Sequence, residues 1–329
     1  MKNNHVLIGA LLCLTASISW GAMFPVAERA LMYIDPFYFA FLRYLAVSVI
    51  LGILLLIKEG KKSFSLEGQG KKLLFFGTMA FTVYNFLIFA GQDLLGHNGA
   101  IVASIMESLM PMISILILWA FKNARPMKYT IASMLLALIG AILVITNGNL
   151  SFVFLLKDSI IPILFILIGV IGWVIYTMGG NQFNGWSTLR YSTLTCILGT
   201  AVSAIITFLA TAMGLSVPTA EVMQSIYGEM IFMIIFPGAI ALALLSWNLG
   251  IKLLTPINGI LFINLVPITT LAIVFIQGGS LSSYELLGTF LVIYALIQNN
   301  YFQRKNLPSR VKEMNPSEKN HLIKGTQHQ

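Results

Sequence analysis

Charged residues are scarce in this chain of 329 residues, where they make up 10% of the sequence. A soluble globular domain carries about 25%. Hydrophobic residues make up 57%, and the mean hydropathy is +0.86. A soluble fold could not bury this much apolar surface, so the composition predicts a protein that lies in a bilayer.

Cysteine and histidine are sparse too, which argues against metal sites and enzymes. Cys13 and Cys196 lie inside apolar runs without zinc-ligand or CxxC spacing, so we interpret them as small packing residues. None of the four histidines lies within an apolar run. Paired catalytic carboxylates, a Ser-His-Asp arrangement and a Gly-rich phosphate loop are also missing. We therefore expect no enzyme activity, no metal and no cofactor.

Apolar runs of about 20 residues, the length of a helix that crosses a bilayer, recur along the chain. They lie near residues 6–27, 36–57, 73–91, 98–120, 128–147, 159–179, 189–212, 230–250, 257–277 and 283–302. The first is too long for the apolar part of a signal peptide, so we expect it to be retained. Because the runs are continuous rather than alternating, they predict an all-α integral membrane protein with ten transmembrane helices.

The placement of lysine and arginine predicts the orientation. If the N-terminus is inside, the inner connectors and the tail collect most basic residues, whereas the outer side holds Arg29 and Lys157. We therefore expect a multi-pass protein of the plasma membrane, of the bacterial inner-membrane type, with both termini cytoplasmic. The positive inner side could contact anionic lipids. Nucleic-acid binding is not expected, because no basic face with stacking aromatics belongs to a soluble domain.

The chain also contains an internal repeat. Leu42-Arg43-Tyr44 recurs as Leu189-Arg190-Tyr191 five spans later, and an odd number of spans inverts the second copy. Three further matches follow in the same order: Trp20 with Trp173, Gly91 with Gly250, and Pro111 with Pro267. We predict inverted five-helix repeats at residues 1–150 and 151–303, and a polar, disordered cytoplasmic tail at 304–329. Such repeats are typical of secondary transporters, whose site lies between the halves.

Several segments carry a resemblance to a known family. They are Ser19-Trp20-Gly21-Ala22-Met23-Phe24-Pro25, Phe41-Leu42-Arg43-Tyr44, Ser108-Leu109-Met110-Pro111, Asn264-Leu265-Val266-Pro267 and Leu286-Leu287-Gly288. In order and spacing they resemble the EamA family of the drug/metabolite transporter superfamily, over about residues 6–302. The connector at 122–126 departs from the pattern, since members often have a Gly-Glu pair there. The resemblance implies ten helices in two inverted halves and export of amino acids, other metabolites or drugs.

Two ionisable residues lie deep in predicted spans, where a charge costs about 2.5–3.5 kcal/mol. Arg43 and Glu107 enter from the outer side to similar depths, so they could pair. One hypothesis is a fixed ion pair between the second and fourth helices. The other is that they contact a charged substrate or that Glu107 takes part in proton coupling. Arg43 could also reach the interface with its long side chain.

Other candidates follow from helical spacing. Ser104, Glu107, Ser108 and Pro111 share one face of the fourth span. Pro111 and Pro267 are predicted helix breaks that leave a carbonyl free to face a cavity, with Asn264 beside Pro267. Aromatic candidates for substrate binding are Trp20, Tyr84, Trp173 and Tyr176, for which ordinary packing is the alternative. The pairs Tyr84-Asn85 and Trp247-Asn248 supply further amphipathic side chains, and Arg190 is interpreted as an anchor at the cytoplasmic interface.

We expect a secondary transporter that exports a small metabolite, such as an amino acid, by alternating access. Proton coupling and facilitated diffusion both stay open. The expected partners are the small-molecule substrate and membrane lipids, and the protein is a monomer or a homodimer. The alternative class is an integral-membrane enzyme or lipid-processing protein, and a third is a structural scaffold.

Overall fold

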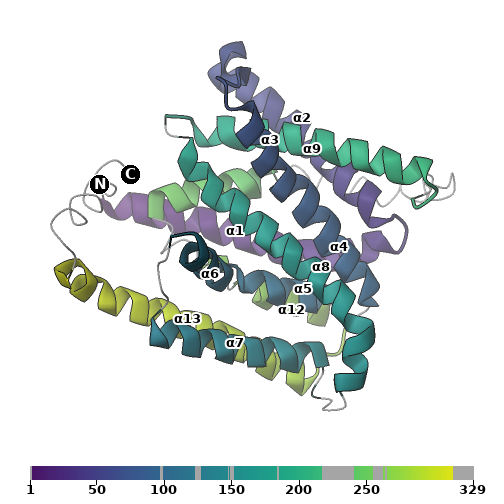
Figure 1. The fold of residues 1–329 in the computed structure, drawn as a ribbon, viewed down its shortest axis with the longest axis vertical. Coiled ribbons are helices and arrows are strands. Elements are labelled where there is room, and N and C mark those ends of the chain that lie inside the picture. The colour runs from purple at the N-terminus through teal and green to yellow at the C-terminus, as the bar shows by residue number, and fades with distance from the viewer. Residues whose placement is uncertain are drawn as a thin grey trace.

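The computed structural model describes residues 2–96, 99–122, 127–146, 148, 152–183, 185–216, 241–254, 262–263 and 265–313. Within these ranges the regular elements are all helices, which confirms the predicted all-α class for this part of the chain. Figure 1 shows long helices packed side by side, with α7 and α13 along one edge.

The helices occur in the following order along the chain. They are α1 (Lys2–Leu31), α2 (Pro36–Glu59), a 3-10 turn (Lys61–Phe64), α3 (Gly70–Thr78), a π-helical turn (Met79–Tyr84), α4 (Asn85–Leu94), α5 (Gly99–Ser108), α6 (Met110–Lys122), α7 (Lys128–Thr146), α8 (Phe152–Gly179), a 3-10 turn (Gly180–Gln182), α9 (Thr188–Ala212), a helix at Ala241–Leu254, α12 (Leu265–Ile276) and α13 (Ser283–Glu313).

Five helical segments are long and apolar enough to cross a membrane: Leu7–Leu31, Pro36–Glu59, Gly70–Leu94, Ile160–Gly179 and Thr188–Ala212. The bent pair α5 and α6 adds a sixth if it is one span. Shorter apolar helices are Lys128–Val144, Ala241–Leu254 and Leu265–Ile276. Parts of the predicted eighth and ninth spans, at 230–240 and 257–261, lie outside the described residues. The described part is therefore a multi-pass membrane fold.

The predicted span at 98–120 is not one straight helix. α5 ends at Ser108, α6 begins at Met110, and the two are bent by 44°. Pro111 lies in the first turn of α6. It has no backbone N–H, and its ring would clash with the Glu107 carbonyl if the helix continued. The break therefore directly follows the turn that carries Glu107.

Polar residues set the start of two spans. Asp35 precedes α2, and its side chain accepts hydrogen bonds from the backbone N–H groups of Phe37 (2.9 Å) and Tyr38 (3.2 Å). Pro36 follows at the first helical position, where a missing N–H costs nothing. Ser187 caps α9 in the same way by accepting from Arg190 N at 2.9 Å.

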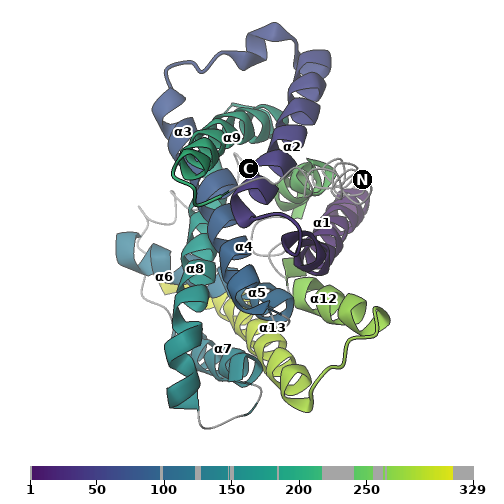
Figure 2. The same ribbon diagram turned by 90° about the vertical axis from the view of Figure 1, so that its right-hand side faces the viewer.

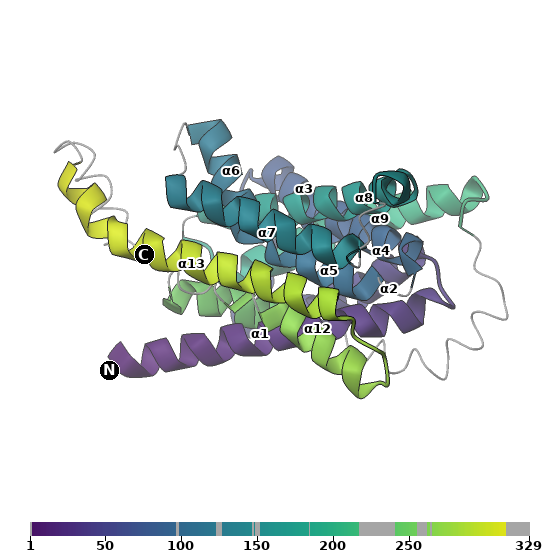
Figure 3. The same ribbon diagram turned by 90° about the horizontal axis from the view of Figure 1, so that it is seen from below.

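Two pairs of helices run antiparallel along their lengths. Tyr38, at the start of α2, shares a 2.9 Å hydrogen bond with Thr211, at the end of α9. Ser187, before α9, donates to Glu59, at the end of α2. α7 and α13 pair likewise, and Figures 1 and 3 show them side by side.

Figures 1 and 3 also place the start of α1 and the last turns of α13 at the same end of the bundle.

α5 occupies the middle of the bundle. All ten of its residues are buried, and it contacts α1, α4, α7, α8, α12 and α13. Figure 2, turned by 90° from Figure 1, shows α5 between α4 and α12. A polar side chain on α5 is therefore surrounded by helices from both halves of the chain.

The crossing of α7 and α13 depends on two glycines that meet. A Cβ atom on Gly140 would lie 2.6 Å from the Gly288 carbonyl oxygen, and one on Gly288 would lie 2.5 Å from the Gly140 carbonyl oxygen. Small residues let backbones approach closely in membranes, where dispersion contacts drive helix association.

Replacing Gly140 with valine should separate these helices. We expect Gly140→Val to lower the free energy of unfolding by about 1–3 kcal/mol, the usual cost of overpacking. Thermal unfolding of the purified protein in detergent measures this. Gly52→Val is the matched control, because the nearest atom to a Cβ at this mid-helix position is 3.9 Å away. Equal midpoints for the two variants would contradict the prediction.

Candidate functional site

Glu107 lies in the last turn of α5 with 2% of its surface exposed. The Tyr84 hydroxyl, from the end of the π-helical turn, donates a hydrogen bond to Glu107 Oε1. The second carboxylate oxygen, Oε2, has no hydrogen-bond partner among the described residues. A buried carboxylate thus keeps one acceptor atom unused.

Arg43 lies in the first third of α2 and is 6% exposed. Its Nη2 donates to Asn85 Oδ1, whereas Nε and Nη1 find no acceptor in the described part of the chain. The guanidinium carbon lies 4.6 Å from the ring centroid of Phe89 and 4.8 Å from that of Tyr44. These aromatic faces make favourable contacts with the cation but leave its Nε and Nη1 atoms without an acceptor.

The π-helical turn positions the hydrogen-bond partners of both charged residues. Asn85 Nδ2 donates to the Ala80 carbonyl at 2.7 Å, which turns Oδ1 of the amide towards Arg43. The preceding residue, Tyr84, binds Glu107. Arg43 and Glu107 therefore do not form the direct ion pair that the sequence allowed, because each is held by its own neutral partner. Single π turns inside α-helices are frequent at functional sites.

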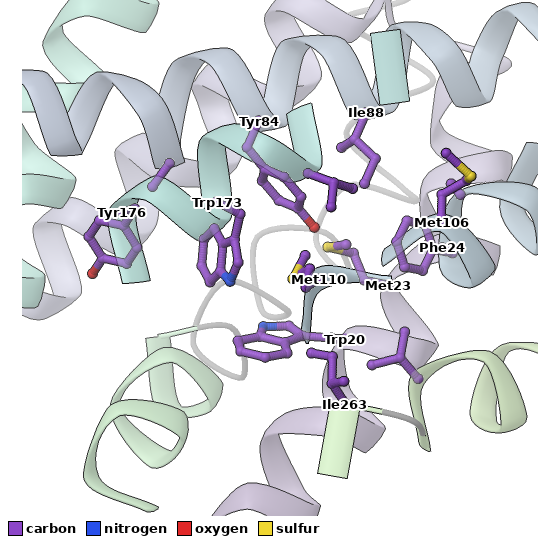
Figure 4. Close-up of a cluster of buried hydrophobic side chains, with 14 of the residues drawn as sticks. Trp20, Met23, Phe24, Tyr84, Ile88, Met106, Met110, Trp173, Tyr176 and Ile263 are labelled. Carbon is purple, nitrogen blue, oxygen red and sulfur yellow. The ribbon is translucent and has the colours of Figure 1, made fainter. Parts of the chain in front are cut away.

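Aromatic rings from four helices cluster beside Glu107. The Trp20 ring lies 5.7 Å from that of Trp173 and 5.0 Å from that of Trp247, centroid to centroid. Trp173 also lies 5.0 Å from Tyr84 and 5.4 Å from Tyr176. Figure 4 shows the Tyr84 hydroxyl pointing into this cluster between methionine side chains. The structure thus brings together the four predicted aromatic residues and adds Trp247.

The remaining predicted residues lie around this centre. Ser104 and Ser108 are buried on α5, and their hydroxyls donate to the carbonyls of Ile101 (2.8 Å) and Ile105 (2.6 Å). Both hydroxyls are therefore satisfied within their own helix. Pro267 lies in the first turn of α12. Asn264 lies outside the described residues.

The proline in α1 leaves a backbone carbonyl that a neighbouring helix bonds, a contact that the sequence pattern does not indicate. Pro25 cannot donate to the Gly21 carbonyl, and Thr270 Oγ1 of α12 donates to it at 2.8 Å instead. Gln92 of α4 donates to the neighbouring Phe24 carbonyl at 2.8 Å. The carbonyl that Pro25 frees thus has a protein partner, as a membrane requires, and the Gln92 contact holds α1 from a second side.

One helix crossing occurs twice in the fold. A Cβ on Gly91 would lie 2.6 Å from the Pro162 carbonyl oxygen of α8, and one on Gly250 would lie 3.0 Å from the Gly9 carbonyl oxygen of α1. Gly9 and Pro162 are 153 positions apart in the sequence, as are Trp20 in α1 and Trp173 in α8. The two crossings therefore involve positions that correspond to each other in the sequence repeat.

Arg190, interpreted from the sequence as an interfacial anchor, has specific partners in the structure. Its guanidinium donates to Glu67 Oε1 and to the Ser65 carbonyl, both at 2.7 Å, and lies 3.8 Å from the Trp186 ring centroid. Trp186 Nε1 donates to Glu67 Oε2 at 3.0 Å. The connector between α2 and α3 is thus fastened to the start of α9, a long-range contact that the sequence pattern does not reveal.

Comparisons with known proteins agree with this architecture. Residues 7–146 match the EamA-like transporter family. The uncharacterized transporter YrdR of Bacillus subtilis (strain 168) is 58% identical over 306 residues, which cover 93% of this chain and 95% of YrdR. The chain belongs to the EamA-like transporter family. A second similar protein of that organism, the uncharacterized transporter YyaM, is 27% identical over 90% of this chain and 94% of its own length.

A solved crystal structure supports the fold independently. It matches 93% of this EamA-like chain and 100% of its own with a TM-score of 0.63 and 16% identity. With its membrane-spanning helices and these relatives, the chain is a multi-pass membrane transporter.

The Asn85 amide should be necessary for burying Arg43. Asn85→Leu removes the acceptor of a buried cation, so we expect the free energy of unfolding to fall by about 1.5–3 kcal/mol. Asn85→Asp should keep most of the stability, because a carboxylate can accept from Arg43. Thr82→Val, which removes a neutral 2.8 Å bond to the Gly199 carbonyl, is the control and should cost about 1 kcal/mol. An Asn85→Leu loss no larger than the Thr82→Val loss would refute this role.

The contact of Glu67 with Arg190 should depend on pH. Hydrogen bonds from Arg190 and Trp186 hold the pKa of the Glu67 carboxyl below its usual value. The contact therefore stabilises the fold above the ordinary glutamate pKa of about 4.3 and is lost as the pH falls through the lower folded value. We expect Trp186 emission, obtained by subtracting the Trp186→Phe spectrum, to shift to the red below about pH 4. Glu67→Gln should show no such shift, and an identical shift in that variant would exclude Glu67 as the titrating group.

Proposed function

We propose that this EamA-like protein is a secondary transporter that exports a small metabolite, such as an amino acid, across the bacterial plasma membrane. It would work by alternating access of two inverted five-helix halves, residues 1–150 and 151–303. The ten spans would leave both termini in the cytoplasm. The observation that carries the proposal is the presence of two buried, incompletely bonded charged groups, Arg43 and Glu107, near aromatic rings from both halves.

Inverted halves are supported by the helix pairings. If the second half is upside down, its second and fifth spans run opposite to those of the first half, as α9 does beside α2 and α13 beside α7. Gly91 crosses α8 at Pro162 and Gly250 crosses α1 at Gly9, and these two partner positions share the 153-residue offset of Trp20 and Trp173. These contacts suit a pseudo-two-fold axis that passes near the Trp20 and Trp173 rings.

The unpartnered atoms of Arg43 and Glu107 favour a zwitterionic metabolite. Arg43 offers two donor nitrogens, Nε and Nη1, to a carboxylate, and Glu107 Oε2 can accept from an ammonium group. Buried polar atoms without partners cost free energy, so a ligand that supplies both partners recovers it. An amino acid carries both groups, and the tryptophan and tyrosine rings suit an apolar side chain.

Two interruptions near the site are suited to conformational change. The break at Leu109 lies two residues after Glu107, and the π-helical turn carries Tyr84 directly before Asn85. Converting the π turn to a regular α-helix would rotate Tyr84 and Asn85 together, so both charged residues would lose their partners in one step. Interrupted helices at the substrate site are typical of alternating-access transporters.

Glu107 is the residue through which a proton gradient would act. Glu107→Gln keeps the size of the side chain and an acceptor for Tyr84 but removes the titratable group. We expect this variant in proteoliposomes to lose uphill, pH-dependent export and to retain substrate exchange. Glu59→Gln, the same change at an exposed glutamate at the end of α2, is the control and should retain both. If pH-dependent export is unchanged in Glu107→Gln, transport is not coupled through Glu107, and facilitated diffusion becomes the better description.

The substrate class is tested by an untargeted comparison of metabolites exported by cells with and without the protein. Amino acids identified in this way are then tested in liposomes with labelled compounds, beside a panel of dyes. Accumulation of an amino acid outside cells that express the wild type, but not the Arg43→Gln variant, supports the proposal. Processing of a lipid or solute without movement across the bilayer would favour an enzyme instead.

A further inference from the structure

Five lysines lie along the chain between the end of α2 and the start of α3, where these helices leave the apolar part of the fold. We name this set the lysine platform; it consists of Lys58, Lys61, Lys62, Lys71 and Lys72. All five side chains are exposed. None of them forms an ion pair with a described carboxylate, although Glu59 and Glu67 lie in the same stretch of the chain. The positive charge of the platform is therefore available to an external partner.

The two nearby glutamates are occupied by the start of α9. Glu59 Oε1 accepts a 2.6 Å hydrogen bond from the Ser187 hydroxyl. Both oxygens of Glu67 are engaged, one by Arg190 and the other by Trp186. The connector is thus fixed in place while its carboxylates face α9, so they do not neutralise the lysines. A fixed connector also loses little conformational entropy when a partner binds.

The platform lies next to side chains that face the hydrocarbon region. Ile57, directly before the first lysine, is 72% exposed, and Phe75, one turn after the last, is 50% exposed. In a transporter that spans the membrane, such exposed apolar side chains contact lipid tails. Lysines within a turn of them reach the level of the headgroups. Figure 2 shows the connector between α2 and α3, which includes Lys61 and Lys62, as an arch at the top of the view.

We propose that the lysine platform binds the phosphate groups of anionic phospholipids in the leaflet at this end of the bundle. Exposed lysine at the headgroup level and phosphate are complementary in charge. Each basic residue near an anionic surface strengthens binding by about fivefold. The proposal is independent of the transported substrate, because no residue of the platform belongs to the Arg43 and Glu107 site.

The experiment uses the full-length protein purified in a neutral detergent. Dioleoylphosphatidylglycerol and dioleoylphosphatidylcholine are added separately, and retained lipid is counted by native mass spectrometry beside the shift in unfolding temperature. We expect the phosphatidylglycerol to be retained and to stabilise the protein. Replacing the five platform lysines with glutamine should weaken its retention at least about tenfold.

A matched control removes the same number of charges from the tail. Five tail residues are replaced with glutamine: Arg304, Lys305, Arg310, Lys312 and Lys319. This variant should retain more phosphatidylglycerol than the platform variant. An equal loss in both variants, or no loss in the platform variant, would overturn the proposal. So would equal retention of phosphatidylcholine, and so would equal stabilisation by millimolar inorganic phosphate, which would identify a site for free anions.

Salt dependence keeps the proposal testable if the glutamine variant does not fold. Retention of phosphatidylglycerol by the wild type should fall when NaCl is raised from about 0.1 to about 0.5 M, because salt screens exposed charges. A variant with arginine at all five positions should keep the lipid. Retention that does not respond to salt, or that is lost in the arginine variant, would exclude charge recognition by the platform.

Discussion

A charged group buried in a bilayer has no water to bind, so each of its polar atoms must be satisfied by protein or by ligand. Arg43 and Glu107 meet this constraint only in part, through Asn85 and Tyr84. The rest of the central architecture serves this arrangement. The π-helical turn places the two partners side by side, and the all-round burial of α5 keeps Glu107 away from solvent.

The same constraint explains the polar contacts elsewhere in the spans. Pro25 frees a carbonyl in α1, and Thr270 supplies the missing hydrogen bond from α12. Hydroxyl groups between α2 and α9 bond to backbone carbonyls or to one another, as Ser48 does with Thr200 at 3.0 Å. Glycines then allow helices to cross closely enough for such contacts, as at Gly140 and Gly288. Packing in this fold is therefore organised by backbone proximity and satisfied polar groups.

The two arginines of the repeated Leu-Arg-Tyr triplet differ because their surroundings differ. Arg43 is buried among aromatic rings at the centre, whereas Arg190 lies at the edge and pairs with Glu67. The triplets are identical over three residues, so nothing in them separates these roles. The difference arises from the connector between α2 and α3, whose Glu67 folds back onto α9. The two arginines therefore lie in different surroundings, and each of these supplies a different partner.

The sequence by itself determined the all-helical membrane class and the two buried charges, because apolar length and intramembrane cost can be read without knowledge of contacts. The order and spacing of its motifs indicated the family. The sequence also indicated the aromatic residues that meet at the centre. Only the tertiary structure decided that Tyr84 and Asn85 hold Glu107 and Arg43 separately. It also decided that the span at 98–120 is broken and that Arg190 pairs with Glu67. Those outcomes depend on which helices cross and at what rotation. Side chains far apart in sequence set these crossings, and the periodicity of one span does not encode them.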